Sequence, residues 1–246
     1  MARKHQPAAA EALEELESAA DRLAEWIREN LWVVFGSIAA LLAIAAIGSW
    51  IATANRRAEE DASAGLAKVR DDYLSAMGVG PGALEVPELA NPEAAAQIQA
   101  EYQERFGEVA DDHPGLIAGT VARLESVRLA SDAGRSAEAL ALAEQALEEA
   151  PSDPAVRGMV LQRLAQRLES EGRWSDAAAQ HEAASKVSGY PLGAWALVDA
   201  ARCYAQAGDI DRAVALYERL DVDHPDLRLP DHLRVQSREL RAAGRD

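Results

Sequence analysis

Few residues of the kinds used for metal, redox or disulfide chemistry occur in this sequence. The 246 residues include one cysteine, Cys203, and five histidines, so an intramolecular disulfide and a cysteine-based metal site are both excluded. Phenylalanine and tyrosine are also scarce, with two and five copies, and any core must therefore be built mainly from small and aliphatic side chains. The glycines and prolines are few and clustered, which is typical of long helices separated by short turns.

Basic residues are outnumbered by acidic ones. The chain has 25 lysines and arginines against 41 aspartates and glutamates, a net charge of −16. Such a surface repels phosphate backbones, so nucleic acid is not expected as a partner. The sequence also lacks a phosphate-binding loop of the P-loop or Rossmann type. We therefore expect no enzyme activity, no cofactor and no bound metal ion.

Charge is missing altogether from one long stretch. From Asn30 to Asn55, 26 consecutive residues carry none. A helix rises about 1.5 Å per residue, so residues 31–52 are long enough to cross a hydrocarbon core about 30 Å thick. Trp32 and Trp50 stand 18 positions apart near its two ends, where tryptophan anchors a helix at the membrane interfaces. Residues 31–52 are predicted to form a transmembrane helix.

A cleavable signal peptide is the alternative interpretation of this stretch. The sequence Ala52-Thr53-Ala54 resembles a small-residue cleavage site. Signal peptides, however, usually have an apolar segment of about 7–15 residues behind a short basic one. Here the apolar run is longer, and an acidic segment of 30 residues precedes it. Both features favour an uncleaved anchor.

The charges that flank this helix do not decide its orientation. Four lysines or arginines lie on each side, so the positive-inside rule gives no preference. In residues 1–30, the positions that fall on one helical face are Leu13, Leu16, Ala20, Leu23 and Ile27. This segment is predicted to be an amphipathic tail in the cytosol, either solvated or docked on a partner helix.

Beyond residue 57 the sequence repeats itself. Four prolines that could close a unit are spaced 37, 40 and 34 residues apart, and three glycines that could mark turns within a unit are spaced 38 and 36. These spacings are close to the period of about 34 residues in tetratricopeptide repeats (TPRs), whose units are two antiparallel helices. Each glycine would permit the left-handed turn that ends a first helix, and each proline would begin the next unit. The residues are Pro114, Pro151, Pro191 and Pro225, and Gly134, Gly172 and Gly208, with Ala139, Ala177 and Ala213 five positions after the glycines.

Two segments have nearly the same sequence. Residues 106–114 read FGEVADDHP and residues 217–225 read YERLDVDHP, which lie 111 positions, or three periods of 37, apart. We interpret them as equivalent ends of second helices, so His113 and His224 lie in different units and cannot share a metal ion. This interpretation implies a first unit with helices at about 58–77 and 92–110. The turn between them, 78–91, is either a mobile insertion or a partner-binding loop.

The sequence therefore predicts an all-α fold in four parts. The N-terminal tail, 1–30, and the transmembrane helix, 31–52, precede a TPR-like right-handed α-solenoid of about four helical hairpins. Residues 53–113 form a degenerate first hairpin with a long turn. Residues 114–246 form TPR-like repeats and a C-terminal helix that caps the open end of the stack.

Two candidate contact surfaces follow from this arrangement. First helices line the concave wall of a TPR array, where arginine can grip carboxylates through two parallel hydrogen bonds. In the alternative interpretation, Arg128 and Arg202 merely pair with Glu125 and Asp199. The candidate peptide groove is Leu124, Arg128, Gln162, Gln166, Trp195, Val198 and Arg202.

The second surface is a face of small residues on the transmembrane helix, which would let another helix approach closely. Because alanine is abundant throughout this helix, chance is the alternative explanation of the pattern. The face consists of Gly36, Ala39, Ala40, Ala43 and Ala46.

The whole layout resembles the ancillary subunit of the bacterial Sec translocon, a family of single-pass envelope proteins with a TPR-like domain. The similarity rests on LAEWIREN before the apolar helix, FGSIAALLAIAA within it, IGSW at its exit and RRAEEDASAGLAKV after it. This sequence departs from the family in the long turn and in the helix beyond Pro225. The resemblance implies a bacterial inner-membrane protein with a cytoplasmic N-terminus and periplasmic repeats. Its partners would be the translocon, periplasmic chaperones or client polypeptides. An envelope scaffold in cell-wall synthesis or division is the alternative function.

Overall fold

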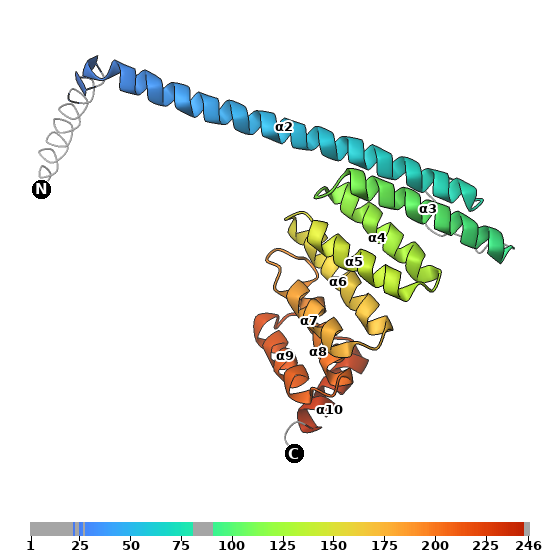
Figure 1. Cartoon of the computed structure of the whole chain (residues 1–246). Helices are drawn as coiled ribbons and strands as arrows, with labels where there is room; N and C mark the ends of the chain where they lie inside the picture. The colour runs from blue at the N-terminus through green and yellow to red at the C-terminus, as the bar shows by residue number, and fades with distance from the viewer. Residues whose placement is uncertain (1–21, 23–24, 27, 81–90, 244–246) are drawn as a thin grey trace, which may run out of the picture. The chain divides into compact units, whose positions relative to one another are not determined.

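The computed structural model describes residues 22, 25–26, 28–80 and 91–243, and every regular element in these ranges is an α-helix. Most of the predicted N-terminal tail, and residues 81–90 of the predicted long turn, lie outside the described residues. The chain divides into two compact units, one up to Arg57 and one from Ala58 onward. Figure 1 shows the helices in chain order.

The longest helix, α2, runs without a break over Leu31–Ala76. Separate helices were expected at 31–52 and 58–77. The structure joins them because the intervening residues 53–57, TANRR, contain neither glycine nor proline and include three good helix formers, one alanine and two arginines. The domain boundary near residue 52 stays a prediction.

The N-terminal part of α2 is long and apolar enough to cross a membrane, and none of its most apolar window is buried within the structure. Trp32 and Trp50, near the ends of this part, are 92% and 73% exposed. The Ser37 hydroxyl donates to the Val33 carbonyl at 2.7 Å, and the Thr53 hydroxyl donates to the Ser49 carbonyl at 2.8 Å. These polar groups are therefore satisfied within the helix, as an apolar environment requires.

The unit from Ala58 onward is a stack of antiparallel helical hairpins, as Figure 1 shows. The C-terminal part of α2 and helix α3 form the first hairpin. Three further helix pairs and a final helix follow it. The prediction of an all-α, TPR-like array of about four hairpins with a C-terminal helix is confirmed. The elements are α3 (Pro92–Asp112), α4 (Ile117–Asp132), α5 (Ser136–Glu149), α6 (Pro154–Ser170), α7 (Trp174–Ser185), α8 (Gly193–Gln206), α9 (Ile210–Asp223) and α10 (Asp231–Ala243).

The turns within the hairpins share one geometry. Gly134, Gly172 and Gly208 have φ values of 72°, 73° and 84°, the left-handed conformation that glycine adopts without steric cost. In each turn the amide after the glycine donates to the carbonyl five residues earlier, at 2.9 Å. Gly78 at the end of α2 has the same conformation, with φ 80°, and the same hydrogen bond. It is therefore the equivalent glycine of the first hairpin.

The two similar segments do occupy equivalent places. His113 ends α3 with φ −130° and ψ 53°, and His224 ends α9 with φ −135° and ψ 59°. Phe106 and Tyr217, which begin the two segments, are each 1% exposed. The interpretation of these segments as equivalent helix ends is confirmed.

The prolines of the repeat pattern were expected to begin helices, but they do not. Pro114, Pro151, Pro191 and Pro225 lie in the loops that precede α4, α6, α8 and α10. Helix starts instead use Pro92 and Pro154, which follow the capping residues Asn91 and Asp153. A proline at the first helical position loses no hydrogen bond because its N–H would have no partner there.

Small residues at fixed positions let the helices approach closely. Ala139, Ala177 and Ala213, each five positions after a turn glycine, are all 0% exposed. A continuous core spans α4 to α9, and Leu233 and Leu240 of α10 pack against it. In the first hairpin the core is aromatic, and the ring centres of Tyr73 and Tyr102 are 5.4 Å apart.

The first helices of successive hairpins form the inner wall of the array. Helix α4 contacts α6, and α6 contacts α8. Among the described residues, no comparable contact joins α5 to α7 or α7 to α9. The first helices are therefore more closely spaced than the second helices, which places α4, α6 and α8 on the concave side.

Candidate protein-binding surface

A cavity of about 220 Å³ opens between α4 and α6 on this inner wall. Apolar side chains from both helices lie beside arginines and acidic residues, so the surface offers hydrophobic contact with charged groups next to it. Leu124 and Arg128 from the predicted groove are among the residues that line the cavity. The full set is Val121, Leu124, Glu125, Val127, Arg128, Ser131, Asp132, Met159, Arg163 and Arg167.

Arg128 is already held by acidic neighbours on its own helix. Its Nε donates to Glu125 at 2.9 Å, and its Nη1 donates to Asp132 at 3.0 Å. Its guanidinium carbon also lies 5.8 Å from the ring centre of Tyr73. Burial lowers the pKa of Arg128, but the charge of Glu125 and its hydrogen bond raise it, and the net shift is upward. The cavity therefore keeps a fixed positive charge with two local counter-ions.

The α6 side of the cavity differs from the prediction by one register position. Met159, Arg163 and Arg167 line it, and their spacing of four places them on one helical face. The predicted residues Gln162 and Gln166 do not line it. Gln162 instead accepts a hydrogen bond from the Tyr190 hydroxyl, and Gln166 is exposed and accepts one from Arg163 at 3.2 Å.

The predicted groove residues on α8 are not equally accessible. Val198 is only 2% exposed and belongs to the core, so its prediction as a groove residue is corrected. Trp195 is 36% exposed. Arg202 pairs with Glu169 at 2.7 Å and with Asp199 at 3.7 Å. The local ion pairs that the alternative interpretation predicted for Arg128 and Arg202 are therefore both present.

A buried polar network beneath this wall was not predicted from the sequence. The ring of His181 on α7 is 1% exposed, and its Nε2 lies 2.7 Å from one carboxylate oxygen of Glu169. The other oxygen of Glu169 accepts a hydrogen bond from Arg202 at 2.7 Å. Cys203 on α8 completes the group, and ligand atoms of Glu169, His181 and Cys203 lie within 4.8 Å of one another.

This environment fixes the charge states of two of its members. Burial raises the pKa of Glu169, but the hydrogen bonds from His181 and Arg202 lower it more, to about 2. Burial raises the pKa of the Cys203 thiol to about 12. The thiol is therefore protonated at neutral pH and is a poor nucleophile.

Glutamate, histidine and cysteine are all ligands that zinc accepts, so these three side chains are the candidate metal donors. Arg202 already supplies a positive charge to the same carboxylate. The arrangement works as an ion-pair network that ties α6, α7 and α8 together. Sequence spacing gave no signal for it, because its members come from three helices and meet only in the folded array.

Comparisons with known proteins give one family match, in the C-terminal part of the repeats. Residues 168–237 match the family model of the tetratricopeptide repeat. The match runs from the end of α6 to α10. A comparison with curated proteins gives no match. A TPR-like helical repeat domain is typical of protein–protein interaction scaffolds.

The solved structures similar to this chain include two of the same TPR-like repeats. The first shows nearly identical TPR-like repeats described as a kinesin light chain from Podosopora anserina. It is 21% identical, with a TM-score of 0.44, over 59% of this chain and 77% of the other. The second is a variant of the same repeats in which methionine replaces one glutamine. It is 19% identical, with a TM-score of 0.43, over 61% and 90% of the two chains.

The predicted face of small residues on α2 is not covered by any other part of the chain that the structure describes. Gly36, Ala39, Ala40, Ala43 and Ala46 are all exposed. A Cβ atom placed on Gly36 would meet no atom within 4 Å. The face can therefore accept another helix, although it stays a predicted contact.

Proposed function

We propose that this chain is a membrane-anchored interaction scaffold that binds polypeptide segments through its repeats. Residues 31–52 are the anchor, and the wall formed by α4, α6 and α8 is the binding surface. One observation carries the proposal. A continuous apolar stretch with tryptophan near both ends, none of whose most apolar window is buried, leads into a TPR-like array whose inner wall contains a cavity.

The proposed place of action is the periplasmic side of the bacterial inner membrane, with the N-terminus in the cytoplasm. There the chain serves as an accessory subunit of the Sec translocon and works with periplasmic folding factors on secreted polypeptides. The similarity of LAEWIREN, FGSIAALLAIAA, IGSW and RRAEEDASAGLAKV to the ancillary translocon subunits supports this placement. The small-residue face around Gly36 is the proposed contact with a membrane partner.

The cavity between α4 and α6 suits weak and adaptable binding. Met159 can adjust its shape to different apolar side chains, and Leu124 adds to the apolar surface. Glu125 and Asp132 already occupy two of the five N–H donors of Arg128, so a carboxylate that reaches this arginine exchanges part of an existing pairing for a new one. The net gain from such an exchange is small, which favours transient contact with many clients over tight binding of one.

Crosslinking of the full chain in intact membranes, followed by identification of its neighbours, tests this function. We expect subunits of the translocation channel and periplasmic folding factors among the adducts. The variant Gly36→Leu with Ala43→Leu should lose the channel adducts while the chain still inserts. Ile38→Leu with Ile44→Leu, on exposed positions outside the proposed face, is the matched control. Adducts confined to proteins of cell-wall synthesis or division would instead support the alternative envelope function.

Topology has its own test. A reporter that is active only in the periplasm, fused after Asp246, should give a signal. A signal from a reporter that works only in the cytoplasm would reverse the proposed orientation.

A further inference from the structure

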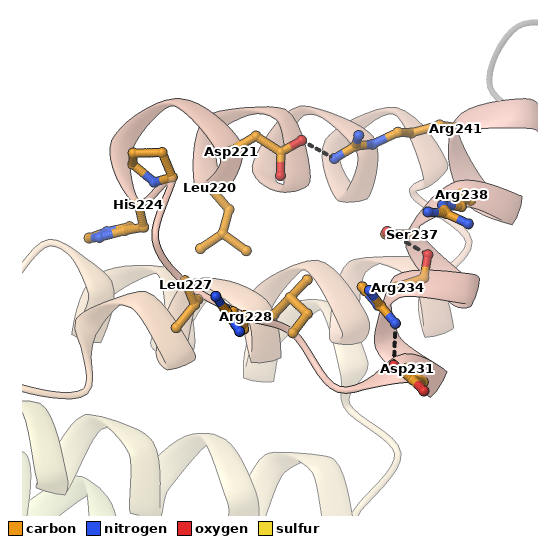
Figure 2. Close-up of a pocket in the computed structure, with 12 residues that line it drawn as sticks. Leu220, Asp221, His224, Leu227, Arg228, Asp231, Arg234, Ser237, Arg238 and Arg241 are labelled. Atoms are coloured by element: carbon orange, nitrogen blue, oxygen red, sulfur yellow. Dashed lines mark hydrogen bonds and ion pairs between the residues drawn. The ribbon is translucent and has the colours of Figure 1, made fainter.

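A second cavity lies at the C-terminal end of the array, between α9 and α10, and has a volume of about 600 Å³. Figure 2 shows that its side chains come from the end of α9, from the following loop and from α10. Four arginines line it against two aspartates, a net charge of +2 with His224 neutral. This is the opposite sign to the whole chain, whose net charge is −16. The arginines are Arg228, Arg234, Arg238 and Arg241.

Only part of this positive charge is neutralised within the described residues. Arg234 pairs with Asp231, and Arg241 donates to Asp221 at 2.7 Å. The side chains of Arg228 and Arg238 are exposed and have no hydrogen bond or ion pair with any described residue. The Nε of Arg241 is buried and is also without a hydrogen-bond partner there. The cavity therefore presents unused donors with the geometry that binds carboxylates.

Apolar side chains form the other part of the cavity. Leu220 is 3% exposed, and Leu227 and Leu229 are half-buried against the main core. A ligand that fits must therefore offer both negative charge and apolar groups.

The geometry points to a binding site for an acidic peptide segment, in which glutamate or aspartate side chains contact Arg228 and Arg238 while an apolar residue contacts the leucines. The site goes beyond the proposed function, because none of its residues belongs to the wall of α4, α6 and α8. A cationic cavity in an acidic protein also selects its ligand, because the surrounding surface repels anions that do not reach the arginines.

An anionic membrane surface is the less favoured ligand. The arginines line a concavity that contains two aspartates, whereas attraction to anionic lipid uses cations that are free to face the headgroups. The overall charge of −16 also opposes approach to such a surface. A peptide can enter the cavity without bringing the rest of the acidic domain against a second negative surface.

The test measures binding of a fluorescein-labelled peptide to the full chain in nonionic micelles by fluorescence anisotropy. The peptide has the sequence Gly-Leu-Glu-Glu-Leu-Glu-Glu-Gly with an amidated C-terminus, so only side-chain carboxylates are presented. Two further peptides have glutamine in place of glutamate, one amidated and one with a free C-terminus. We expect the glutamate peptide to bind at least tenfold more tightly than either. Tighter binding of the glutamine peptide with a free C-terminus would assign the site to a terminal carboxylate and overturn the side-chain assignment.

The variant Arg228→Gln with Arg238→Gln removes two positive charges that have no partner within the described residues, so the fold should be unaffected. We expect this variant to bind the glutamate peptide at least tenfold more weakly. Arg70→Gln with Arg157→Gln is the matched control, because the exposed side chains of these two arginines also have no described partner and their loss changes the net charge equally. The control should change binding less than twofold. Equal losses in the two variants would show non-specific attraction and overturn the proposal.

A lipid surface gives a different result. In that case the glutamate peptide does not bind, and the chain held in zwitterionic nanodiscs sediments with phosphatidylglycerol liposomes in a way that Arg228→Gln with Arg238→Gln abolishes. Absence of both binding events would also overturn the proposal. Crosslinks formed by the inner wall should not change in this variant, so this site and the proposed function fail independently.

Discussion

The buried network around Glu169 makes the stability of the repeats depend on a single carboxylate. Glu169 is 17% exposed at its side chain and accepts short hydrogen bonds from both His181 and Arg202. Its pKa is about 2 in the folded chain, against an ordinary value of 4.5. A pKa lowered by one pH unit corresponds to about 1.4 kcal/mol, so this lowered pKa stabilises the folded state by about 3 kcal/mol when the carboxylate is charged.

The direction of the pH dependence follows from the lowered pKa. The unfolded chain takes up a proton at this carboxyl below about pH 4.5, whereas the folded chain does so only near pH 2. The stabilisation is therefore complete above the unfolded pKa and is lost as the pH falls toward the folded pKa. By pH 4 the loss amounts to about 1 kcal/mol.

The variant Glu169→Gln removes the charge and keeps the shape of the side chain. We expect it to lower the free energy of unfolding by about 3 kcal/mol at pH 7 and by about 2 kcal/mol at pH 4. The measurement is urea unfolding of the full chain in nonionic micelles, followed by circular dichroism at the two pH values. Glu171→Gln is the control, because the only ion pair of the Glu171 side chain with a described residue is a 3.9 Å contact with Arg173. It should cost less than about 0.5 kcal/mol.

A difference between wild type and Glu169→Gln that stays the same at both pH values would refute this reasoning. A loss below about 0.5 kcal/mol at pH 7 would do so as well, because it would mean that the hydrogen bonds only compensate for burial.

Three further substitutions test the packing of the array, each by the same unfolding measurement. Gly119→Ala places a Cβ 2.1 Å from the backbone oxygen of His113 and should lower the free energy of unfolding by about 2–4 kcal/mol. Its control is Gly107→Ala, whose Cβ would meet no atom closer than 4.0 Å and which should be neutral or stabilise its helix by up to about 1 kcal/mol. Equal effects of the two substitutions would contradict the close contact at Gly119. Glu59→Gln weakens the cap of α4, in which the Glu59 carboxylate accepts hydrogen bonds from the amides of Ile117 and Ala118 at 3.1 and 2.9 Å. It should lower the free energy of unfolding by about 1 kcal/mol at low salt and by less at high salt. A loss of stability that does not depend on salt would exclude a charge effect. Arg123→Met removes a guanidinium that is 4% exposed and pairs with two carboxylates, while it keeps most of the buried stem. A change within about 1 kcal/mol is expected, because Asp111 and Glu149, the carboxylates left without this partner, are 66% and 29% exposed and can be solvated by water. A loss above about 3 kcal/mol would show that these carboxylates need the guanidinium.

The features predicted correctly from the sequence are those fixed by local chemistry and repeated. Gly134, Gly172 and Gly208 recur because each hairpin needs a left-handed residue at its turn, and the structure gives all three that conformation. Gly78 does the same work but was missed. It stands 56 positions before Gly134, since the segment inserted in the first hairpin breaks the period.

The lining of the inner wall was harder to predict because it depends on how neighbouring helices face one another, and its role as a contact surface stays a prediction. A shift of one position on α6 exchanged Gln162 and Gln166 for Arg163 and Arg167. Val198 was assigned to the surface although it lies in the core, because counting from the turn glycine fixes height along a helix better than direction around it.

The network of Glu169, His181 and Cys203 has no sequence signature, since its members come from three different helices. The C-terminal cavity also depends on tertiary structure. The sequence predicted a capping helix over its last residues, but only the fold brings Arg228 of the loop and Arg238 of α10 to one concavity.

The central claim, that the inner wall of the repeats binds polypeptide, is tested most directly by photo-crosslinking from single positions in the full chain in intact membranes. A photoreactive amino acid replaces Met159, which lines the cavity between α4 and α6. In a matched chain it replaces Ala179, an exposed residue on the second helix α7. The account predicts protein adducts on irradiation from position 159 and few from position 179. Adducts of equal yield from both positions, or from position 179 alone, would contradict it.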